Sequence, residues 1–402
     1  MAIRNISVML FIFFLSNITL AVNGLLPPKL FDVTKYGAIA NGRTDNSLAF
    51  LRAWGDACGY EGKSRVWVPP GIYLLGSVSF SGPCNGPISF LIKGTLTAPT
   101  DPRMFFTDTW IGFRYVDRLT VAGGGYLDGK GPAAWPYNDC HKNPGCKPLP
   151  ATLRLDFITN SRVHHLRSIN SKNTHINVFA CTNLSISQVR ITAPAESPNT
   201  DGIRIGSSNT IKISNSVIST GDDCISMVSG SQNIDISYVA CGPGHGISIG
   251  SLGRSHENND DVVGIRVSKC TFIGSDNGVR IKTWAPSLSS LASNITFEDI
   301  VIRNARNPIV IDQQYCPLSG CMEGDSAVQV QNVMFKNIWG ISQTKVAVNI
   351  QCSGVLPCKN VQLINIHLAY RVVTDRRPLF ALMSWVPLME DRFLLAVYKC
   401  AI

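Results

Sequence analysis

The sequence predicts an all-β fold, a right-handed parallel β-helix with a short N-terminal capping helix. Equally spaced motifs carry this prediction: Asp201, Asp223 and His245 are 22 residues apart, twice over, and each precedes a short apolar alternation. A repeat of this length with one short strand per repeat is typical of a solenoid. Residues one repeat apart then lie on neighbouring strands, about 4.8 Å from each other. We therefore expect the two carboxylates and the imidazole to form one column.

A register of alternating apolar pairs is the second observation. One set precedes the motifs: Leu184/Ile186, Ile211/Ile213, Ile234/Ile236, Ile265/Val267 and Ile295/Phe297. A second set follows them: Ile203/Ile205, Ile225/Met227, Ile247/Ile249, Val279/Ile281 and Ile309/Ile311. A third, weaker set comprises Val189/Ile191, Val217, Val239, Phe272 and Ile300/Ile302. Three strands per turn, with apolar side chains inward, describe a parallel β-helix of roughly ten coils. A β-sandwich is the alternative, but it does not predict motifs in phase.

Residues 1–24 have the pattern of a secretory signal peptide. Arg4 supplies the positive flank, an apolar stretch runs from Val8 to Leu15, and Ala21 and Gly24 offer small residues for cleavage. A membrane anchor is the alternative, but the apolar run is shorter than the ~20 residues that a span needs. We expect a secreted protein with no membrane partner after signal removal.

The first ordered elements are expected to be a short opening strand and a helix. Phe31-Asp32-Val33 and Tyr36-Gly37-Ala38 have the pattern of the strand, and Asp45 is suited to cap the helix. The apolar residues of the helix are Leu48, Leu51 and Trp54. Such a helix would cover the apolar cross-section at the open end of a solenoid.

No linker divides the chain before residue ~370, so residues 25–370 are predicted to form one β-helix domain. The motif interval grows to 32 residues between His245 and Asn277, and the extra residues fall in the loop Leu252–Asp261. Inserted loops on one face commonly shape a binding groove. Residues 371–402 lose the rhythm of strands and turns. They are predicted to be a divergent C-terminal tail, either a capping element or a mis-assigned end of the chain.

Thirteen cysteines indicate an oxidising compartment. Their spacing favours bridges at Cys140/Cys146, Cys316/Cys321 and Cys352/Cys358, and a bridge between adjacent coils at Cys224/Cys241. The odd count leaves at least one thiol unpaired unless an intermolecular bond forms. Zinc is the alternative, but the chain has no Cys-x-x-Cys pair, so no metal is expected. Asn183 and Asn294 lie in Asn-x-Ser/Thr sequons that a secreted protein could glycosylate.

The formal charge of +9 favours an anionic partner. Nucleic acid is not expected, because the chain lacks a basic run or a basic helix. An acidic polysaccharide fits a secreted protein better. An ordinary excess of solvated Lys and Arg is the alternative that charge alone leaves open.

Asp201, Asp222 and Asp223 form the core of the candidate catalytic site. Glycosidic hydrolysis requires one carboxylic acid to protonate the leaving oxygen and a second carboxylate to activate water or attack carbon. Clustered carboxylates repel one another, which raises the pKa of at least one of them. His245 lies between two glycines and could tune the acid or act as a base. The alternative is that these residues only occupy solenoid turns, and three motifs in phase argue against it.

Arg280 and Lys282 alternate with apolar residues, so both should face outward on the same strand. Two cations beside an acid cluster suit a substrate carboxylate, although they could equally balance the charge of the three aspartates. Tyr315 lies at the end of the next coil, where its ring could stack on a sugar.

Together these residues resemble the polygalacturonases, glycoside hydrolases that degrade pectin and have a right-handed parallel β-helix. Four segments match the signature motifs of that family in order: Asn199-Thr200-Asp201, Gly221-Asp222-Asp223, Gly244-His245-Gly246 and Arg280-Ile281-Lys282. The resemblance extends from about Phe31 to about Tyr370. Within the family the chain is most similar to plant pollen-type exopolygalacturonases, through Gly94–Pro99 and Leu153–Phe157.

The resemblance implies inverting hydrolysis of α-1,4-linked galacturonic acid in the cell wall. Asp222 would be the general acid, Asp201 and Asp223 would hold and activate water, and His245 would support the acid. Asn199, Arg280, Lys282 and Tyr315 would contact the substrate. An inverting site should separate its acid and its water-activating carboxylate by roughly 6.5–9.5 Å. No cofactor is implied, and a monomer is expected.

Three other functions stay open. An endo-acting enzyme would have a groove open at both ends. An exo-acting enzyme, whose groove is blocked at one end, would remove single units from the non-reducing end. The insertions Leu252–Asp261 and Cys140–Cys146 are long enough to narrow the groove. A pectate lyase would use calcium and a basic residue instead of paired carboxylates. A non-catalytic pectin-binding wall protein would not need the intact acid cluster.

Overall fold

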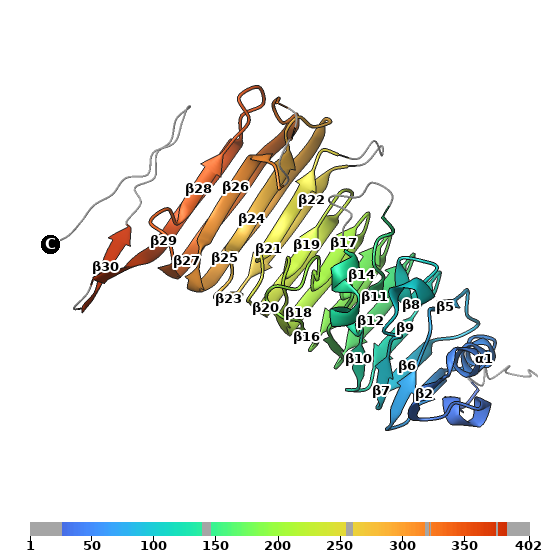
Figure 1. Ribbon diagram of the computed structural model, residues 1–402. Coiled ribbons are helices and arrows are strands. Elements are labelled where there is room, and N and C mark those ends of the chain that lie inside the picture. The colour runs from blue at the N-terminus through green and yellow to red at the C-terminus, as the bar shows by residue number, and fades with distance from the viewer. Residues whose placement is uncertain are drawn as a thin grey trace, which may run out of the picture.

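The structure is a computed structural model that describes residues 26–138, 146–254, 260–317, 321, 323–374 and 377–383. These residues form an elongated solenoid of parallel strands, and the helix α1 (Ser47–Cys58) covers its N-terminal end (Figure 1). The predicted right-handed parallel β-helix with a capping helix is confirmed. The predicted signal peptide lies outside the described residues.

One strand from each coil enters a ten-stranded parallel sheet, which agrees with the predicted ten coils. Its strands are β5 (Val78–Ser81), β8 (Thr109–Arg114), β11 (Ala151–Asp156), β14 (Ile176–Phe179), β17 (Ile203–Gly206), β19 (Ile225–Met227), β21 (Ile247–Leu252), β24 (Asn277–Trp284), β26 (Asn307–Tyr315) and β28 (Val348–Gln351). The second set of apolar pairs lies in this sheet, as expected.

The remaining strands form one larger sheet that wraps the other sides of the coils. In the N-terminal half they are β1 (Lys29–Asp32), β2 (Asn41–Asp45), β3 (Ser64–Val68), β4 (Ile72–Leu74), β6 (Ile88–Ile92), β7 (Thr95–Thr97), β9 (Leu119–Ala122), β10 (Tyr126–Asp128), β12 (Thr159–His164), β13 (Arg167–Ile169), β15 (Thr182–Ser187) and β16 (Arg190–Thr192). In the C-terminal half they are β18 (Asn209–Ser219), β20 (Gln232–Cys241), β22 (Val262–Ser268), β23 (Thr271–Ile273), β25 (Ser290–Ala305), β27 (Val328–Ser342), β29 (Lys359–Thr374) and β30 (Arg377–Met383).

The first and third predicted sets meet at single left-handed residues inside this larger sheet. In β18, Asn215 has a φ of 50° and turns the chain from one side of the coil to the next. The prediction for the third set is wrong by one residue in this strand, because it selected Val217 instead of Ile218. Val217 is exposed and Ile218 is buried, because the left-handed residue reverses the alternation that a regular strand would keep.

The interior of the solenoid is a stack of apolar residues in exact register from coil to coil. Ile203 pairs with Ile225, and Ile225 pairs with Ile247, on three adjacent strands. All three side chains are completely buried. The predicted column of apolar residues is therefore confirmed, and it fixes the relative position of the turns that precede these strands.

The N-terminal cap differs from the prediction in two details. Tyr36-Gly37-Ala38 does not continue the opening strand, because a 3-10 helix, η1 (Val33–Tyr36), begins once Asp32 accepts a hydrogen bond from the backbone of Thr34. In α1 the buried residues are Ala49, Phe50, Ala53, Trp54, Ala57 and Cys58. Leu48 and Leu51 are exposed, so of the three predicted core residues only Trp54 packs inward.

The helix α1 begins one residue later than predicted. Asn46 is the N-cap and its side chain makes no cap hydrogen bond, whereas Asp45 accepts the backbone N–H of Ser47 at 2.9 Å. Trp54 explains the choice of buried face, because its ring packs 5.2 Å from Phe80 and 5.3 Å from Phe113, centroid to centroid. Aromatic packing therefore orients the cap.

Disulfides join turns of the solenoid. Three predicted bridges are confirmed: Cys224–Cys241, Cys316–Cys321 and Cys352–Cys358. A fourth bridge, Cys58–Cys84, was not predicted, because 26 residues separate the two thiols and only the coil brings them together. Cys140 lies outside the described residues, so the predicted Cys140/Cys146 bridge does too. Two described thiols, Cys181 and Cys270, are free and buried.

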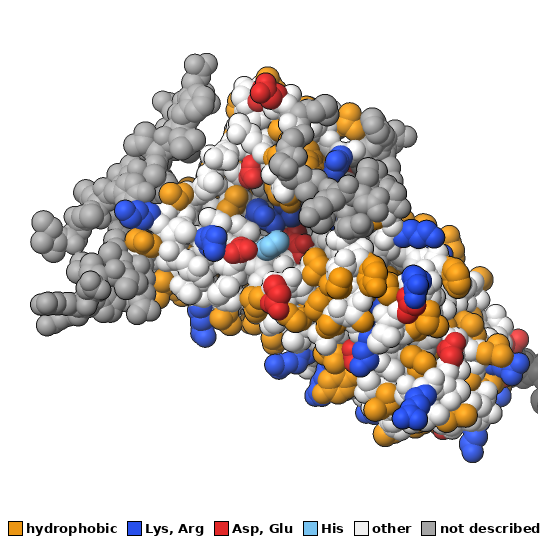
Figure 2. Space-filling model, viewed as in Figure 1, with side chains coloured by type: hydrophobic (Ala, Val, Ile, Leu, Met, Phe, Trp, Pro, Cys, Tyr) orange, Lys and Arg blue, Asp and Glu red, His pale blue; other side chains and the backbone are white. Residues whose placement is uncertain are grey.

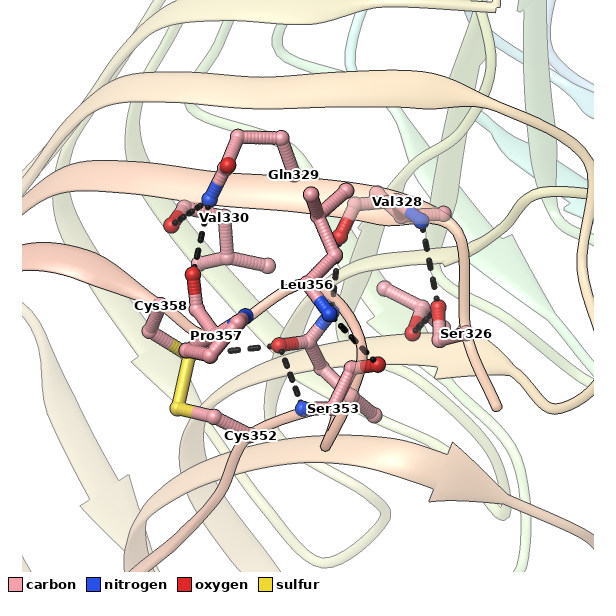
Figure 3. Close-up of a disulfide and its surroundings, with 11 residues drawn as sticks. Ser326, Val328, Gln329, Val330, Cys352, Ser353, Leu356, Pro357 and Cys358 are labelled. Atoms are coloured by element: carbon pink, nitrogen blue, oxygen red, sulfur yellow. Dashed lines mark hydrogen bonds between the residues drawn. A yellow bond between two sulfur atoms is a disulfide. The ribbon is translucent and has the colours of Figure 1, made fainter. Parts of the chain in front are cut away.

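The Cys352–Cys358 bridge closes a hydrogen-bonded turn in the last coils. Beside the Cys352–Cys358 bridge, the amide of Gln329 donates to the carbonyl of Pro357 at 3.0 Å and the backbone of Leu356 donates to Ser353 at 3.3 Å (Figure 3). The final pair, β29 and β30, is antiparallel and departs from the solenoid (Figure 1). Among the described residues, no helix has the length and apolar character needed to cross a membrane.

Candidate active site

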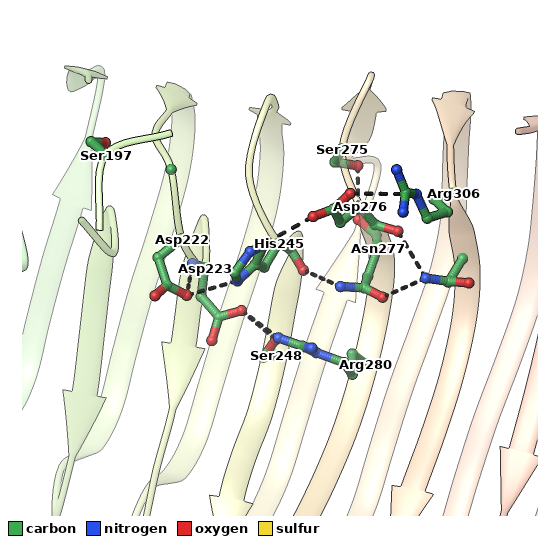
Figure 4. A network of polar contacts seen from close by, with 12 residues as sticks. Ser197, Asp222, Asp223, His245, Ser248, Ser275, Asp276, Asn277, Arg280 and Arg306 are labelled. Atoms are coloured by element: carbon green, nitrogen blue, oxygen red, sulfur yellow. Dashed lines mark hydrogen bonds and ion pairs between the residues drawn. The ribbon is translucent and has the colours of Figure 1, made fainter. Parts of the chain in front are cut away.

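The predicted site residues gather at one edge of the ten-stranded sheet. Asp201 and Asp223 lie in the turns just before β17 and β19, and His245 lies just before β21. Because these strands are in register, the residues two positions before them are stacked as well. The predicted column exists, and Figure 4 shows two of its members, Asp223 and His245, on neighbouring coils.

Asp222 and Asp223 reach the same side of the molecule because they lie in a turn between β18 and β19. In a regular strand their side chains would point to opposite faces. Gly221 makes the turn possible, because a Cβ at this position would lie 2.1 Å from the carbonyl oxygen of Ser197 in the preceding coil. Any other residue would push the two coils apart.

Asp222 is paired with His245. The imidazole Nδ1 donates to the carboxylate Oδ1 at 2.9 Å, and the backbone N–H of Asp223 donates to the same oxygen at 2.7 Å (Figure 4). Burial alone would raise the pKa of Asp222, but the hydrogen bond and charge of His245 outweigh it and hold that pKa below its ordinary value. The same hydrogen bond raises the pKa of His245 against the effect of its burial.

Glycines on both sides of His245 allow the coils to approach. Gly244 and Gly246 have φ values of 121° and 80°, in the left-handed region that disfavours side chains. A Cβ on Gly246 would lie 2.3 Å from the carbonyl oxygen of Asn277, and one on Gly244 would lie 2.5 Å from that of Asp222. The glycines therefore bring His245 against Asp222.

Asp223 is surrounded by donors. Its Oδ1 accepts from Ser248 Oγ at 2.8 Å and from Arg280 Nη2 at 2.9 Å, and its Oδ2 accepts from Lys282 Nζ at 2.8 Å. Both cations face away from the solenoid core, as predicted, yet they are largely buried because they pair with Asp223. The charge-balancing role left open by the sequence is therefore present. The two cations and the hydroxyl group of Ser248 therefore fix the orientation of this carboxylate.

Asp201 is the aspartate of this cluster whose pKa is raised. It is buried and accepts one side-chain hydrogen bond, from Ser226 Oγ at 2.9 Å. Burial, followed by the charges of Asp222 and Asp223, raises its pKa to about 7. The direction agrees with the expected effect of clustering, but burial contributes more to the raised pKa than the two neighbouring acids do.

Asn199 and Tyr315 flank this column on opposite sides along the solenoid. Asn199 is exposed, in a left-handed conformation, and accepts a hydrogen bond from Asn138 Nδ2 at 2.8 Å. The ring of Tyr315 lies 5.2 Å from Lys282 Nζ and 5.9 Å from the guanidinium of Arg280. The eight predicted residues therefore come from consecutive coils: five from the turns before β17, β19 and β21, two from within β24, and Tyr315 from the end of β26.

A further set of polar residues continues the column beyond His245 and was not predicted. Asp276 Oδ2 lies 3.7 Å from His245 Nε2, and its Oδ1 lies 3.7 Å from Arg306 Nε (Figure 4). Asn277 Nδ2 donates to the carbonyl of His245 at 3.2 Å, and Asn307 donates to Asn277. The signal was available, because Asn277 and Asn307 lie two residues before Val279 and Ile309, just as Asp223 lies two residues before Ile225.

The carboxylate spacing departs from the expected value. One oxygen each of Asp222 and Asp223 and one ring nitrogen of His245 lie within 4.8 Å of one another. This is shorter than the roughly 6.5–9.5 Å of inverting sites, because the two acids are adjacent in a single tight turn. The spacing would suit a divalent ion, but Arg280 and Lys282 already neutralise Asp223 and disfavour a third positive charge.

The surface over this column is polar and mixed in charge. In Figure 2 a histidine lies near the centre of the visible face with acidic and basic side chains gathered beside it. The half-buried acid and imidazole can transfer a proton to a bound molecule, and the donors that the two cations do not use on Asp223 can pair with an anion.

Comparison with known proteins places these residues in a family. The sequence profile of glycosyl hydrolases family 28 matches residues 58–377. The chain is 47% identical to an exopolygalacturonase of Platanus acerifolia over 85% of its length and 90% of that protein. It is 44% identical to an exopolygalacturonase of Zea mays, over 86% and 84% of the two chains.

A crystal structure supports the same fold. The exopolygalacturonase of Thermotoga maritima superposes with a TM-score of 0.72 at 20% identity, over 88% of this chain and 95% of that one. The chain belongs to glycosyl hydrolases family 28. It is therefore a glycoside hydrolase, and the polygalacturonase family predicted from its motifs is confirmed.

Proposed function

We propose that this protein is a secreted exopolygalacturonase that releases galacturonate from the non-reducing end of pectic polygalacturonate in the cell wall. One observation carries the proposal: Asp222, paired with His245, lies beside Asp223, which forms ion pairs with two cations. The site thus combines a proton donor, a carboxylate for water and fixed positive charge in one column. Relatives named as exopolygalacturonases support the exo assignment.

Asp222 acts as the general acid in this proposal. The raised pKa of His245 keeps a proton on the Asp222–His245 pair, and that proton passes through Oδ1 of Asp222 to the leaving glycosidic oxygen. Asp223 and Asp201 hold the attacking water from two adjacent coils, and Asp223 accepts its proton. Loss of either partner of the pair would therefore slow the step in which the bond breaks.

Arg280 and Lys282 recognise the carboxylate of the substrate. Arg280 uses Nε and Nη2 toward Ser248 and Asp223, and within the described part of the chain its Nη1 makes no hydrogen bond. Lys282 donates one of its three ammonium hydrogens to Asp223. The remaining donors are available to a galacturonate, and Tyr315, packed against both cations, provides a ring face for the sugar.

Exo action requires a block at one end of the groove. The segment between β10 and β11 supports a block on the N-terminal side, because it carries the turns η3 (Gly131–Ala133) and η4 (Trp135–Tyr137) at the same edge as the catalytic turns. Trp135 Nε1 donates to the carbonyl of Ser171, and Asn138 reaches Asn199 two coils away. The polymer would extend from Asp222 toward Arg280 and Tyr315.

Product analysis on polygalacturonate in excess chelator tests the proposal. We expect monomeric galacturonate to accumulate steadily while viscosity falls slowly, with no unsaturated product. Early oligomers with a rapid loss of viscosity would indicate an endo enzyme, unsaturated ends a lyase, and binding without products a non-catalytic wall protein. In the same reaction, NMR should detect β-galacturonate first, because inversion of an α-bond yields the β-anomer. First appearance of the α-anomer would contradict inversion and agree with the short Asp222–Asp223 spacing.

A further inference from the structure

A second polar groove lies on the larger sheet, whereas the candidate active site borders the ten-stranded sheet. It has a volume of about 550 Å³. It crosses six neighbouring strands, β3, β6, β9, β12, β15 and β18. At about 4.8 Å per strand its length is about 24 Å. We call it the basic groove.

Cations and hydroxyl groups alternate along the floor of the basic groove. The strand register places in one row Arg65, Ser89, Thr120, Arg162, Ser185 and Lys212. The three cations of this row are exposed, and the three hydroxyl residues between them are half-buried. Long and short side chains therefore alternate, which leaves hollows between the positive charges.

The charge of the basic groove is largely uncompensated. Its lining residues include two more cations, Lys63 and Arg118, and no carboxylate. Within the described part of the chain, Lys63, Arg65 and Lys212 make no ion pair, and only Arg118 pairs with a neighbouring acid, Asp117. Like charges placed together without acids raise the local concentration of anions.

We propose that the basic groove binds an extended carboxylated polysaccharide and so anchors the enzyme to its polymer outside the catalytic site. Cations spaced two and three strands apart match charges distributed along a chain better than one compact headgroup. Hydroxyls between them can pair with sugar hydroxyls. Single-stranded nucleic acid is disfavoured because no aromatic ring lines the groove. A membrane is disfavoured because its leucines, Leu119 and Leu184, are buried.

This inference rests on the proposed function for the identity of the polymer. The catalytic site acts on a chain end, whereas the basic groove holds a segment on another side of the same coils. A bound segment would therefore keep the enzyme on the polymer between successive cleavages without occupying the catalytic turns.

The test compares two triple variants that each remove three exposed positive charges. Arg65→Gln, Arg162→Gln and Lys212→Gln alter the basic groove, and Arg43→Gln, Arg52→Gln and Lys93→Gln are the matched control at sites without ion pairs. Both are made with Asp222→Asn, and binding to insoluble polygalacturonate is measured with saturating trigalacturonate, which fills the catalytic site but cannot span the basic groove. All proteins carry Asn183→Gln, because a glycan on Asn183 would cover the groove.

The basic-groove variant should bind about tenfold more weakly than the control at low salt, because each exposed ion pair contributes modestly. The difference should vanish at high salt. Ser89→Glu, which adds a negative charge without removing a cation, should weaken binding in the same direction. Equal binding of both triple variants, or tighter binding of RNA or anionic vesicles than of polygalacturonate, would overturn the inference. With Asp222 intact, both variants should hydrolyse trigalacturonate equally; if the parent cannot hydrolyse it, the proposed function fails instead.

Discussion

Two columns of residues run through the same coils, two positions apart, and they differ in every respect except spacing. The interior column of Ile203, Ile225 and Ile247 repeats one residue type and is completely buried. The turn column, formed by Asp201, Asp223 and His245, changes its chemistry at each coil. The repeated interior residues set the distances between coils, and the different residues at the turns supply the groups that we propose for catalysis.

The interior column is packed too closely to accept a side chain of another shape. The turn column, in contrast, keeps buried acids close together although their repulsion destabilises the folded state. Asp201 is buried beside two other acids, which raises its pKa to about 7. A protein selected only for stability would not keep that arrangement. The two columns should therefore respond oppositely to substitution: changes in the turns should affect catalysis, and changes inside should affect stability.

Asp222→Asn should have the largest effect. We expect kcat on polygalacturonate to fall by about 10³-fold, since general acid catalysis contributes 10²–10⁴-fold, while the circular dichroism spectrum stays unchanged. Asp276→Asn is the matched control, because Asp276 is exposed and lies 3.7 Å from the same imidazole. It should alter kcat less than about tenfold. Similar losses in both variants would remove Asp222 from its role as the acid.

Ile225→Ala tests the interior column. Removing a completely buried isoleucine side chain should lower the free energy of unfolding by about 2–5 kcal/mol. The variant should keep near-normal turnover below its melting temperature. Val217→Ala, on the exposed side of a neighbouring strand, should cost less than about 0.5 kcal/mol. Chemical denaturation measures both, and comparable costs would contradict the assigned register.

Lys282→Gln tests the contact between the turn column and Lys282, which lies on β24 and pairs with Asp223. Loss of one charge-assisted contact should lower kcat/KM by roughly ten- to a hundredfold. Because Lys282 also neutralises the buried Asp223, we expect kcat to fall as well. Steady-state kinetics on polygalacturonate separates the two constants, and an unchanged kcat would mean that the Asp223 contact is catalytically neutral.

Asp201→Asn should have the smallest effect, which is an increase in the stability of the folded protein. The pKa of Asp201 is raised to about 7, so between pH 4 and 7 the folded protein binds more protons than the unfolded chain, and stability falls as pH rises. The variant should melt roughly 2–5 °C higher than the parent at pH 7 and within about 1 °C of it at pH 4. A pH-independent difference would contradict the raised pKa. Calorimetry at the two pH values provides the comparison.

Local errors in the prediction arose where one residue depended on a distant one. The register of Val217 and Ile218 depends on a left-handed Asn215, and Asn adopts that conformation without a fixed pattern in the sequence. The buried face of α1 was misassigned because Phe80 and Phe113, which hold Trp54, come from later coils. Cys58–Cys84 and the Asp276–Arg306 contact also join residues from different coils.

The sequence by itself determined the coil, because a 22-residue period with alternating apolar pairs is a local property that stacking repeats. It also determined which residues meet at the catalytic turns, since equal spacing implies register. Only the tertiary structure decided the electrostatics. The pairing of Arg280 and Lys282 with Asp223, the raised pKa of Asp201 and the short Asp222–Asp223 spacing depend on burial and on distances of a few ångströms. Spacing along a chain fixes neighbours, whereas charge interactions depend on the solvent that the folded coils exclude.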